Sequence, residues 1–182
     1  MGVTNMTAKE IHTEIMNHPV QISDKACEAL ALEGADPVYA GSGWTDVRGQ
    51  NVSNPAPGQG VEQYVVLFSS AHDAAAFFTA SAQTWVACSN RQLAVTSPGR
   101  PDRVLNIGPV ANMRNILSAD TQLEVSPPPG AQGPFVVRCQ RALTVANNVI
   151  IDVWVGGLRQ ESSESSNFAV IIANQIAAKV PT

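Results

Sequence analysis

The segment 138–157 constrains the fold most, because it has the pattern of a β-hairpin whose turn fixes the pairing of its strands. Two strand-like runs flank Asn147-Asn148, and asparagine tolerates the positive φ that tight hairpin turns require. A two-residue loop at this place predicts these facing pairs: Val145 and Ile150, Leu143 and Asp152, Arg141 and Trp154, and Cys139 and Gly156. Because the register is fixed, the residues that share each face of the hairpin are also fixed.

The size and charge of the chain exclude several classes of protein. Its 182 residues suffice for one domain with a real core, and we expect a single domain over 1–182. The net charge is −4 and the basic residues are scattered, so no nucleic-acid partner is expected. No apolar run is long enough to span a membrane.

The N-terminal region is polar and lacks the apolar core of a signal peptide. We expect residues 1–6 to be disordered or left over from expression, and any membrane contact to need an anchor that this chain does not contain. The three cysteines leave two interpretations open. An exported domain would form one disulfide and keep one thiol, whereas a cytosolic domain would bury all three thiols.

The order of the expected elements favours an α+β fold with a mostly antiparallel sheet flanked by helices. Helices are expected over about 8–17, 24–34, 70–88 and 168–180, from their capping residues and apolar spacing. Strands are expected at about 45–52, 61–68, 91–97, 102–107, 109–117 and 121–125, followed by the hairpin. The breaks at Pro98-Gly99 and Gly108-Pro109 separate the short strands.

Arg141 and Asp152 are the only charged residues on an otherwise apolar face of the hairpin. They are diagonal neighbours in the predicted register, close enough for their side chains to meet. Because a charge on a buried face needs a partner, we interpret them as an ion pair that helps to fix the register. The alternative is that they form the polar floor of a ligand cleft.

A candidate ligand site lies around the first predicted strand. Alternation places Trp44, Arg48 and Gln50 on one face of it, and Gln63 interrupts the apolar face of the next strand. With Tyr39 nearby, these aromatic and amide side chains could line a pocket for a small polar or amphipathic ligand. An ordinary solvated sheet face would show the same pattern.

Enzyme and metal motifs are absent from the sequence. His12, His18 and His72 are far apart, with no cysteine or carboxylate at ligand spacing, so no metal site and no cofactor are expected. No nucleophile elbow, catalytic triad or phosphate-binding loop is present. We therefore expect no catalytic residues and no enzymatic activity.

Four stretches together resemble the PknH-type extracellular sensor domain family, which includes actinobacterial receptor-kinase ectodomains and related lipoproteins. They run from Asp36 to Trp44, from Val61 through the helix that ends at Cys88, from Cys139 to Val153, and from Ile172 to Val180. The resemblance implies an α+β fold with an open cleft, a location outside the cell membrane, and ligand binding rather than catalysis.

The resemblance also implies how the cysteines pair. Family members typically have four cysteines in two disulfides, and Cys27, Cys88 and Cys139 match three of these positions. The fourth position falls at Gly156, opposite Cys139 in the predicted hairpin. The implied arrangement is therefore a disulfide between Cys27 and Cys88, with Cys139 as a free thiol.

The leading hypothesis from the resemblance is an extracytoplasmic sensor or ligand-binding domain of the cell envelope. The chain lacks the H-R-D and D-F-G motifs of a kinase, so it is either the ectodomain of a receptor or a mature lipoprotein. The missing cysteine and the polar start favour the lipoprotein. The alternative function is a structural or protein-interaction domain that uses its sheet face and forms a homodimer.

Overall fold

The computed structural model describes residues 7–17, 19–54, 59–127, 130, 133–157 and 167–181. The strands in these segments are β1 (Thr7–His12), β2 (Gln21–Ile22), β3 (Trp44–Asn54), β4 (Gln59–Phe68), β5 (Gln92–Thr96), β6 (Arg103–Met113), β7 (Ile116–Val125), β8 (Phe135–Ala146) and β9 (Val149–Gly156). The helices are the 3₁₀ turn η1 (Lys25–Cys27), α1 (Glu28–Ala31), α2 (Asp36–Tyr39), α3 (Ala71–Ala87) and α4 (Phe168–Ala177).

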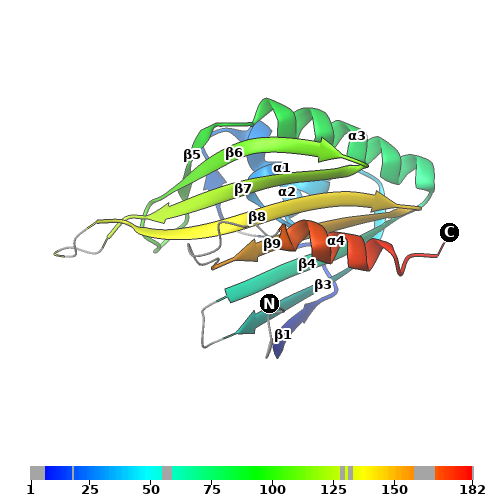
Figure 1. Cartoon of the computed structure of the whole chain (residues 1–182), viewed down its shortest axis with the longest axis horizontal. Helices are drawn as coiled ribbons and strands as arrows, with labels where there is room; N and C mark the ends of the chain where they lie inside the picture. Colours follow the sequence, from blue (N-terminus) through cyan, green and yellow to red (C-terminus); the bar gives the residue numbers. More distant parts are fainter. Residues whose placement is uncertain are drawn as a thin grey trace.

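The strands form one nine-stranded sheet within the described residues, in the order β1-β3-β4-β9-β8-β7-β6-β5-β2 (Figure 1). Every neighbouring pair is antiparallel. The predicted α+β class with a mostly antiparallel sheet is therefore confirmed. Residues 1–6, which we expected to be disordered or left over from expression, lie outside the described part.

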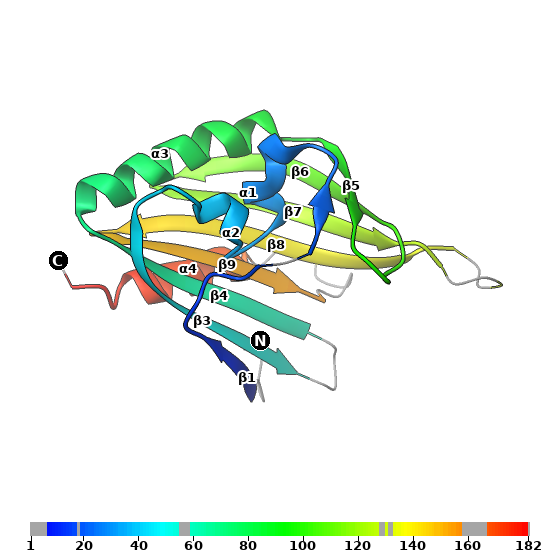
Figure 2. The same ribbon diagram turned by 180° about the vertical axis from the view of Figure 1, so that it is seen from behind.

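Helices pack on both faces of the sheet and give the molecule two separate cores. On the α3 face, α1, α2 and α3 enclose a large cluster that includes Tyr39, Phe68 and Trp85. On the α4 face, Ala169 and Ala173 pack α4 onto β8 and β9. Figure 2 shows that the three helices of the α3 face gather over one part of it and leave the ends of β3, β4 and β9 without a helical cover.

The predicted hairpin is confirmed as β8 and β9. Cys139 pairs with Gly156, and the other three predicted pairs also face each other. Asn147 has a φ of 50°, as the tight turn requires. The hairpin lies at the centre of the sheet, so its register sets the faces of the strands on both sides of it.

Three of the predicted helices are confirmed, although each is shorter than predicted. Asp24 caps the turn that leads into α1, Ser70 caps α3 by accepting a hydrogen bond from the Asp73 amide, and α4 occupies part of 168–180. Capping side chains and apolar spacing are local signals, and the structure follows them here. β2 and the single turn α2 are very short and were not predicted. None of the helices in the described segments has the length and hydropathy needed to cross a membrane.

The predicted helix over 8–17 is wrong, because Thr7–His12 forms the edge strand β1. Ile11, which we assigned to an apolar helix face, is 70% exposed and pairs with Gln50 of β3. An isolated helix of about ten residues is marginal in water, whereas the edge of β3 offers a full set of backbone partners. The long-range pairing therefore overrides the local capping signal.

The predicted break at Gly108-Pro109 is also wrong. These residues form a bulge inside β6, where the register shifts between Ile107 and Val110. Proline fits a bulge because it has no N–H to donate to the ladder. The turn lies instead at Arg114 and Asn115, which both have positive φ. The three strands predicted at 102–107, 109–117 and 121–125 are therefore two long strands, β6 and β7.

The disulfide between Cys27 and Cys88 is present, and the Cys139 thiol is free and buried. The arrangement implied by the family resemblance is therefore confirmed. The disulfide ties the turn before α1 to the end of α3. It thereby fixes the helices of the α3 face against each other.

Candidate functional site

The residues predicted to line one ligand cleft do not lie on one face of the sheet. A β-bulge between Trp44 and Asp46 reverses the alternation, so that Trp44 faces the buried Phe68 while Asp46 faces Leu67 on the opposite face. Trp44 packs against the α3-face core. The expectation that Trp44 shares a face with Arg48 and Gln50 is therefore wrong, and the bulge is the reason.

The other predicted ligand residues are also divided. Arg48 and Gln50 lie on the α4 face, where Arg48 forms an exposed ion pair of 2.7 Å with Asp46. Gln63 donates a hydrogen bond of 3.0 Å to Gln50. Tyr39 is fully buried in the α3-face core. Binding of a ligand by Arg48, Gln50 and Gln63 stays a prediction, as does the homodimer.

An open cavity of about 460 Å³ lies on the α3 face, where no helix covers the sheet. We call it the Trp154 groove; its lining includes Lys9, Asn51, Ser53, Glu62, Val137 and Trp154 together with Gly60 and Gly156. Gly60 and Gly156 face each other across β4 and β9. A Cβ on Gly156 would lie 2.0 Å from the Trp154 ring, and one on Gly60 would lie 3.6 Å from it. The indole therefore lies on a strip of sheet that has no side chains.

A row of directly facing residues joins the groove to the buried interior. Asn51 faces Glu62, Glu62 faces Trp154, and Trp154 faces Arg141. Facing residues of neighbouring strands lie on the same face with their side chains in contact range. The exposed end of the row is polar, its middle is aromatic, and its inner end is a guanidinium with 1% of its surface exposed.

The predicted ion pair between Arg141 and Asp152 is confirmed. Arg141 Nη2 lies 2.8 Å from Asp152 Oδ1, and both side chains are 1% exposed. The contact is ionic, because Oδ1 accepts no well-aligned hydrogen bond. Asp152 Oδ2 accepts hydrogen bonds of 3.1 Å from the Tyr39 hydroxyl and the Gly34 amide. Tyr39, which we predicted as a ligand residue, thus positions the carboxylate instead.

Arg141 also holds the end of α1. Its Nε donates to the Leu30 carbonyl at 3.1 Å and its Nη2 to the Ala29 carbonyl at 3.3 Å. Its Nη1 lies 3.3 Å from Glu33 Oε2, and the guanidinium carbon lies 5.5 Å from the centre of the Trp85 ring. These contacts satisfy a buried charge from several elements at once.

One guanidinium faces two carboxyl groups here, and Asp152 is the more deeply buried partner. Burial raises the pKa of Glu33 from 4.5 to about 8, although the Arg141 charge opposes the shift. Glu33 therefore holds a proton at neutral pH. The cluster is then one cation, one anion and one neutral acid.

The raised pKa of Glu33 predicts how stability depends on pH. Between pH 4.5 and about 8 the folded state holds a proton that the unfolded state releases, so the free energy of unfolding should fall as pH rises. The slope should not exceed about 1.4 kcal/mol per pH unit, which is the limit for the release of one proton. Urea unfolding at several pH values should show the slope in the wild type and a smaller one in Glu33→Gln. Equal slopes in the wild type and in Glu33→Gln would show that Glu33 is not protonated in the folded state.

The free thiol of Cys139 faces Gly156, the position at which the family resemblance implies a fourth cysteine. Burial raises the pKa of this thiol to about 12, so it is a poor nucleophile. Its facing residue Gly156 is covered by the Trp154 ring, as described above. The indole occupies the space that a side chain at position 156 would need.

We expect Gly156→Cys alone to destabilise the protein and to form no disulfide, because the indole blocks the introduced side chain. Combined with Trp154→Ala, the same substitution should give a disulfide with Cys139, since the two positions face each other. Peptide mapping without reductant distinguishes the variants. A disulfide in the single variant at wild-type stability would show that the ring moves freely.

The Trp154 groove was not predicted from the sequence. Trp154 lies on the hairpin whose register was predicted, but the pairing of β4 with β9 that brings Glu62 beside it was not predicted. Lys9 could not be placed there either, because it was assigned to a helix. Gly60 and Gly156 were the available signal, because glycine in a strand marks a close approach to the backbone.

The described residues contain no group of three or more His, Cys, Asp or Glu side chains placed to hold a metal ion. His12 stacks on Tyr64 with ring centres 5.9 Å apart, and His72 is exposed in the first turn of α3. His18 lies outside the described residues.

The comparisons with known proteins agree with this architecture. The sequence pattern of the PknH-like extracellular domain matches residues 1–179. The chain is 34% identical over 182 residues to the serine/threonine-protein kinase PknH of Mycobacterium tuberculosis strain H37Rv, covering 99% of the chain and 26% of the kinase. It is 33% identical to PknH of Mycobacterium bovis, covering 99% of the chain and 28% of the kinase. The chain thus spans about a quarter of the length of these relatives.

A solved structure gives the same result. The crystal structure of the extracellular domain of PknH from Mycobacterium tuberculosis superimposes with a TM-score of 0.83 at 31% identity, covering 97% of this chain and 84% of that one. The match is to an extracellular domain and not to a kinase catalytic domain, so the chain is an extracytoplasmic, non-catalytic domain. It belongs to the family of PknH-like extracellular domains.

Proposed function

We propose that this domain is a sensor that binds a small polar or amphipathic ligand of the cell envelope in the Trp154 groove. The observation that carries the proposal is the position of Trp154. Its indole lies on two facing glycines and lines an open cavity of about 460 Å³. An aromatic side chain placed in this way offers a rigid apolar surface to a ligand.

The polar side chains around Trp154 suggest the class of ligand. Lys9, Glu62 and Asn51 supply a cation, an anion and an amide at the rim, and Asn51 donates to Glu62 across 3.5 Å, the outer limit for a hydrogen bond. One apolar ring with several donors and acceptors is complementary to a ligand with an apolar face and polar edges. Sugar rings of envelope glycans have this combination, and we propose them as the class.

The groove has a structural connection through which binding could be transmitted. Trp154 faces Arg141, and Arg141 holds the carbonyl groups at the end of α1 and the side chain of Glu33. A ligand that moves Trp154 or Glu62 changes the surroundings of this cluster. It shifts the protein between two states only as far as it prefers one of them.

The proposal does not depend on how the domain is attached to the membrane, as the ectodomain of a receptor or as a lipoprotein. The relatives named above are kinases, which favours the ectodomain of a receptor, and the lipoprotein form would hold the same groove in the same compartment. In either case the ligand would come from outside the cell membrane.

Tryptophan fluorescence tests the proposal directly. Trp85 is fully buried and Trp44 is half-buried, so a ligand in the groove should change mainly the emission of Trp154. We expect a chitotriose or muropeptide titration to give a saturable change that is lost in Trp154→Leu. Glu62→Gln should weaken the same binding by roughly tenfold, the effect of one hydrogen bond to a charged group.

The matched controls lie on the opposite face of the sheet. Arg48→Ala and Gln63→Ala should leave the titration unchanged, because their side chains are directed to the α4 face. Loss of binding in these variants but not in Trp154→Leu would move the ligand site to the α4 face. Absence of binding to glycans, muropeptides and lysolipids would contradict the proposal.

A further inference from the structure

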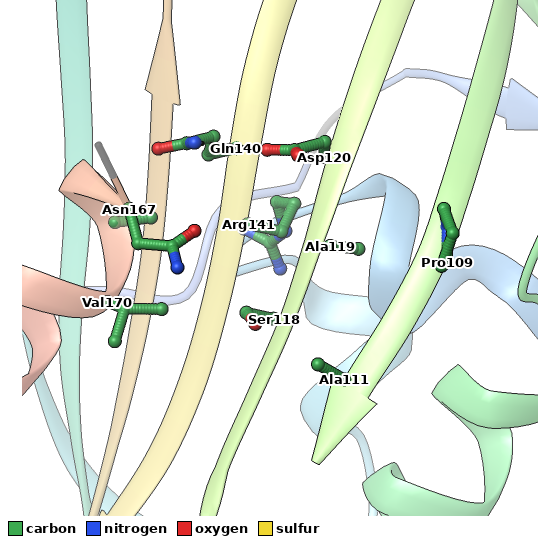
Figure 3. Close-up of a pocket in the computed structure, with 10 residues that line it drawn as sticks. Pro109, Ala111, Ser118, Ala119, Asp120, Gln140, Arg141, Asn167 and Val170 are labelled. Atoms are coloured by element: carbon green, nitrogen blue, oxygen red, sulfur yellow. Dashed lines mark hydrogen bonds between the residues drawn. The ribbon is translucent and has the colours of Figure 1, made fainter. Parts of the chain in front are cut away.

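A second pocket lies on the opposite face of the sheet, between the first turn of α4 and strands β6 to β8 (Figure 3). Its volume is about 240 Å³, and its polar lining includes Ser118, Asp120, Gln140 and Asn167. Ala111 faces Ser118, so small side chains hollow the sheet beside α4. We call this cavity the α4 pocket.

Gln140 brings an unsatisfied acceptor to the pocket. Its side chain is 5% exposed, and its amide nitrogen donates a hydrogen bond of 3.0 Å to Asp120 Oδ1. Its amide oxygen Oε1 is buried and accepts no hydrogen bond. A buried acceptor without a donor is costly, and a ligand that carries an N–H group would remove that cost.

Asp120 adds a negative charge at the same place. It faces Gln140 directly across β7 and β8, and it takes part in no ion pair among the described residues. Asp120 Oδ1 already accepts the Gln140 amide hydrogen, so Asp120 Oδ2 and Gln140 Oε1 are the acceptors left at this end of the pocket. Such a set is complementary to an ammonium group, which has donors and a positive charge.

The first turn of α4 offers backbone donors, in contrast to the acceptors of Gln140 and Asp120. Asn167 precedes the helix but makes no side-chain capping bond, and the first helical hydrogen bond comes from the Ile171 amide. The backbone amides of Phe168, Ala169 and Val170 therefore have no acceptor within the helix. The helix dipole adds positive potential at the same place. Asn167, Ala169 and Val170 line the pocket, so this end of the pocket favours a carboxylate.

We propose that the α4 pocket binds the zwitterionic head of a small α-amino acid or a short peptide. The ammonium group lies at Gln140 Oε1 and the Asp120 carboxylate, and the carboxylate group lies at the first turn of α4. The small lining residues Ala111 and Ser118 restrict the side chain of the ligand to a short one. This site is separate from the Trp154 groove and does not depend on the function proposed for it.

Calorimetric titration of the whole domain with L-alanine and D-alanine tests the assignment. We expect saturable binding with a millimolar or lower Kd for at least one enantiomer. N-acetylalanine lacks the ammonium group and alaninamide lacks the carboxylate, so each should bind at least tenfold more weakly. Equal binding of all these compounds would overturn the proposal, and so would the absence of binding by either alanine.

Asp120→Asn and the matched control Asp46→Asn identify the site. Both residues are exposed on the α4 face, but Asp46 lies on β3 and pairs with Arg48. Alanine affinity should fall at least tenfold in Asp120→Asn and in Gln140→Met, and stay unchanged in Asp46→Asn. Wild-type affinity in Asp120→Asn would refute the site. Competition of calcium with alanine would assign these oxygen atoms to a metal ion and also refute it.

Discussion

Replacing Asp152 with alanine is expected to lower the free energy of unfolding by about 3–5 kcal/mol, among the largest losses for a single side chain in this protein. The change leaves the Arg141 guanidinium, which is 1% exposed, without the carboxylate that balances its charge. It also leaves the Tyr39 hydroxyl and the Gly34 amide without their acceptor. A buried charge and two buried donors then lack partners at once.

Urea unfolding followed by circular dichroism measures this effect. The matched control is Asp46→Ala, which removes the exposed ion pair with Arg48 and should cost less than about 1 kcal/mol. Glu33 cannot replace Asp152 without giving up its proton, because burial raises its pKa. A loss below about 1 kcal/mol for Asp152→Ala would show that water reaches the cluster.

Removing the disulfide is expected to have an effect of similar size. Cys27 and Cys88 are 61 residues apart in the sequence, so their disulfide restricts a long loop of the unfolded chain. In the chain-entropy model such a loop corresponds to about 4 kcal/mol. The double variant Cys27→Ala/Cys88→Ala should lose close to this amount, with an additional loss from packing because both residues are buried.

Cys139→Ala is the matched control, since it removes a buried sulfur atom without breaking a cross-link. Comparing the two variants by urea unfolding separates the loss of packing from the loss of the loop. If the double variant were within about 1 kcal/mol of twice the effect of Cys139→Ala, the chain-entropy account would be wrong here.

The fold could be predicted where local signals and long-range pairing agree. The turn at Asn147-Asn148 needs positive φ, which asparagine tolerates, so the register of β8 and β9 followed from the sequence. That register placed Arg141 beside Asp152. The same local reasoning identified α3 from its Ser70 cap.

Prediction failed where the rest of the sheet decides the conformation. Thr7–His12 carries a helix-capping signal but pairs with β3, and no pattern within the segment reveals that partner. The turn at Arg114 puts an arginine at a φ of 52°, which residue preferences do not favour. The resemblance to the family supplied the disulfide, which spacing alone left open.

The candidate site was missed for a more specific reason. Alternation places side chains correctly only in a strand without bulges, and β3 contains a bulge between Trp44 and Asp46. A shift of one residue placed Trp44 against the α3-face core and left Arg48 and Gln50 on the other face. The tryptophan that lines a groove is Trp154, on the strand whose register was already known.

The indole that lies on Gly156 also takes the place of a covalent link at the open end of the hairpin. A covalent bond between β8 and β9 at this place would hold the strands at a fixed separation. Here the backbone pairing of Cys139 with Gly156 holds the strands and the Trp154 ring packs on Gly156, and a side chain can change rotamer where a disulfide cannot. The space above Gly156 is therefore occupied by one aromatic side chain and not by a disulfide, so its occupancy does not depend on the redox state of the surroundings.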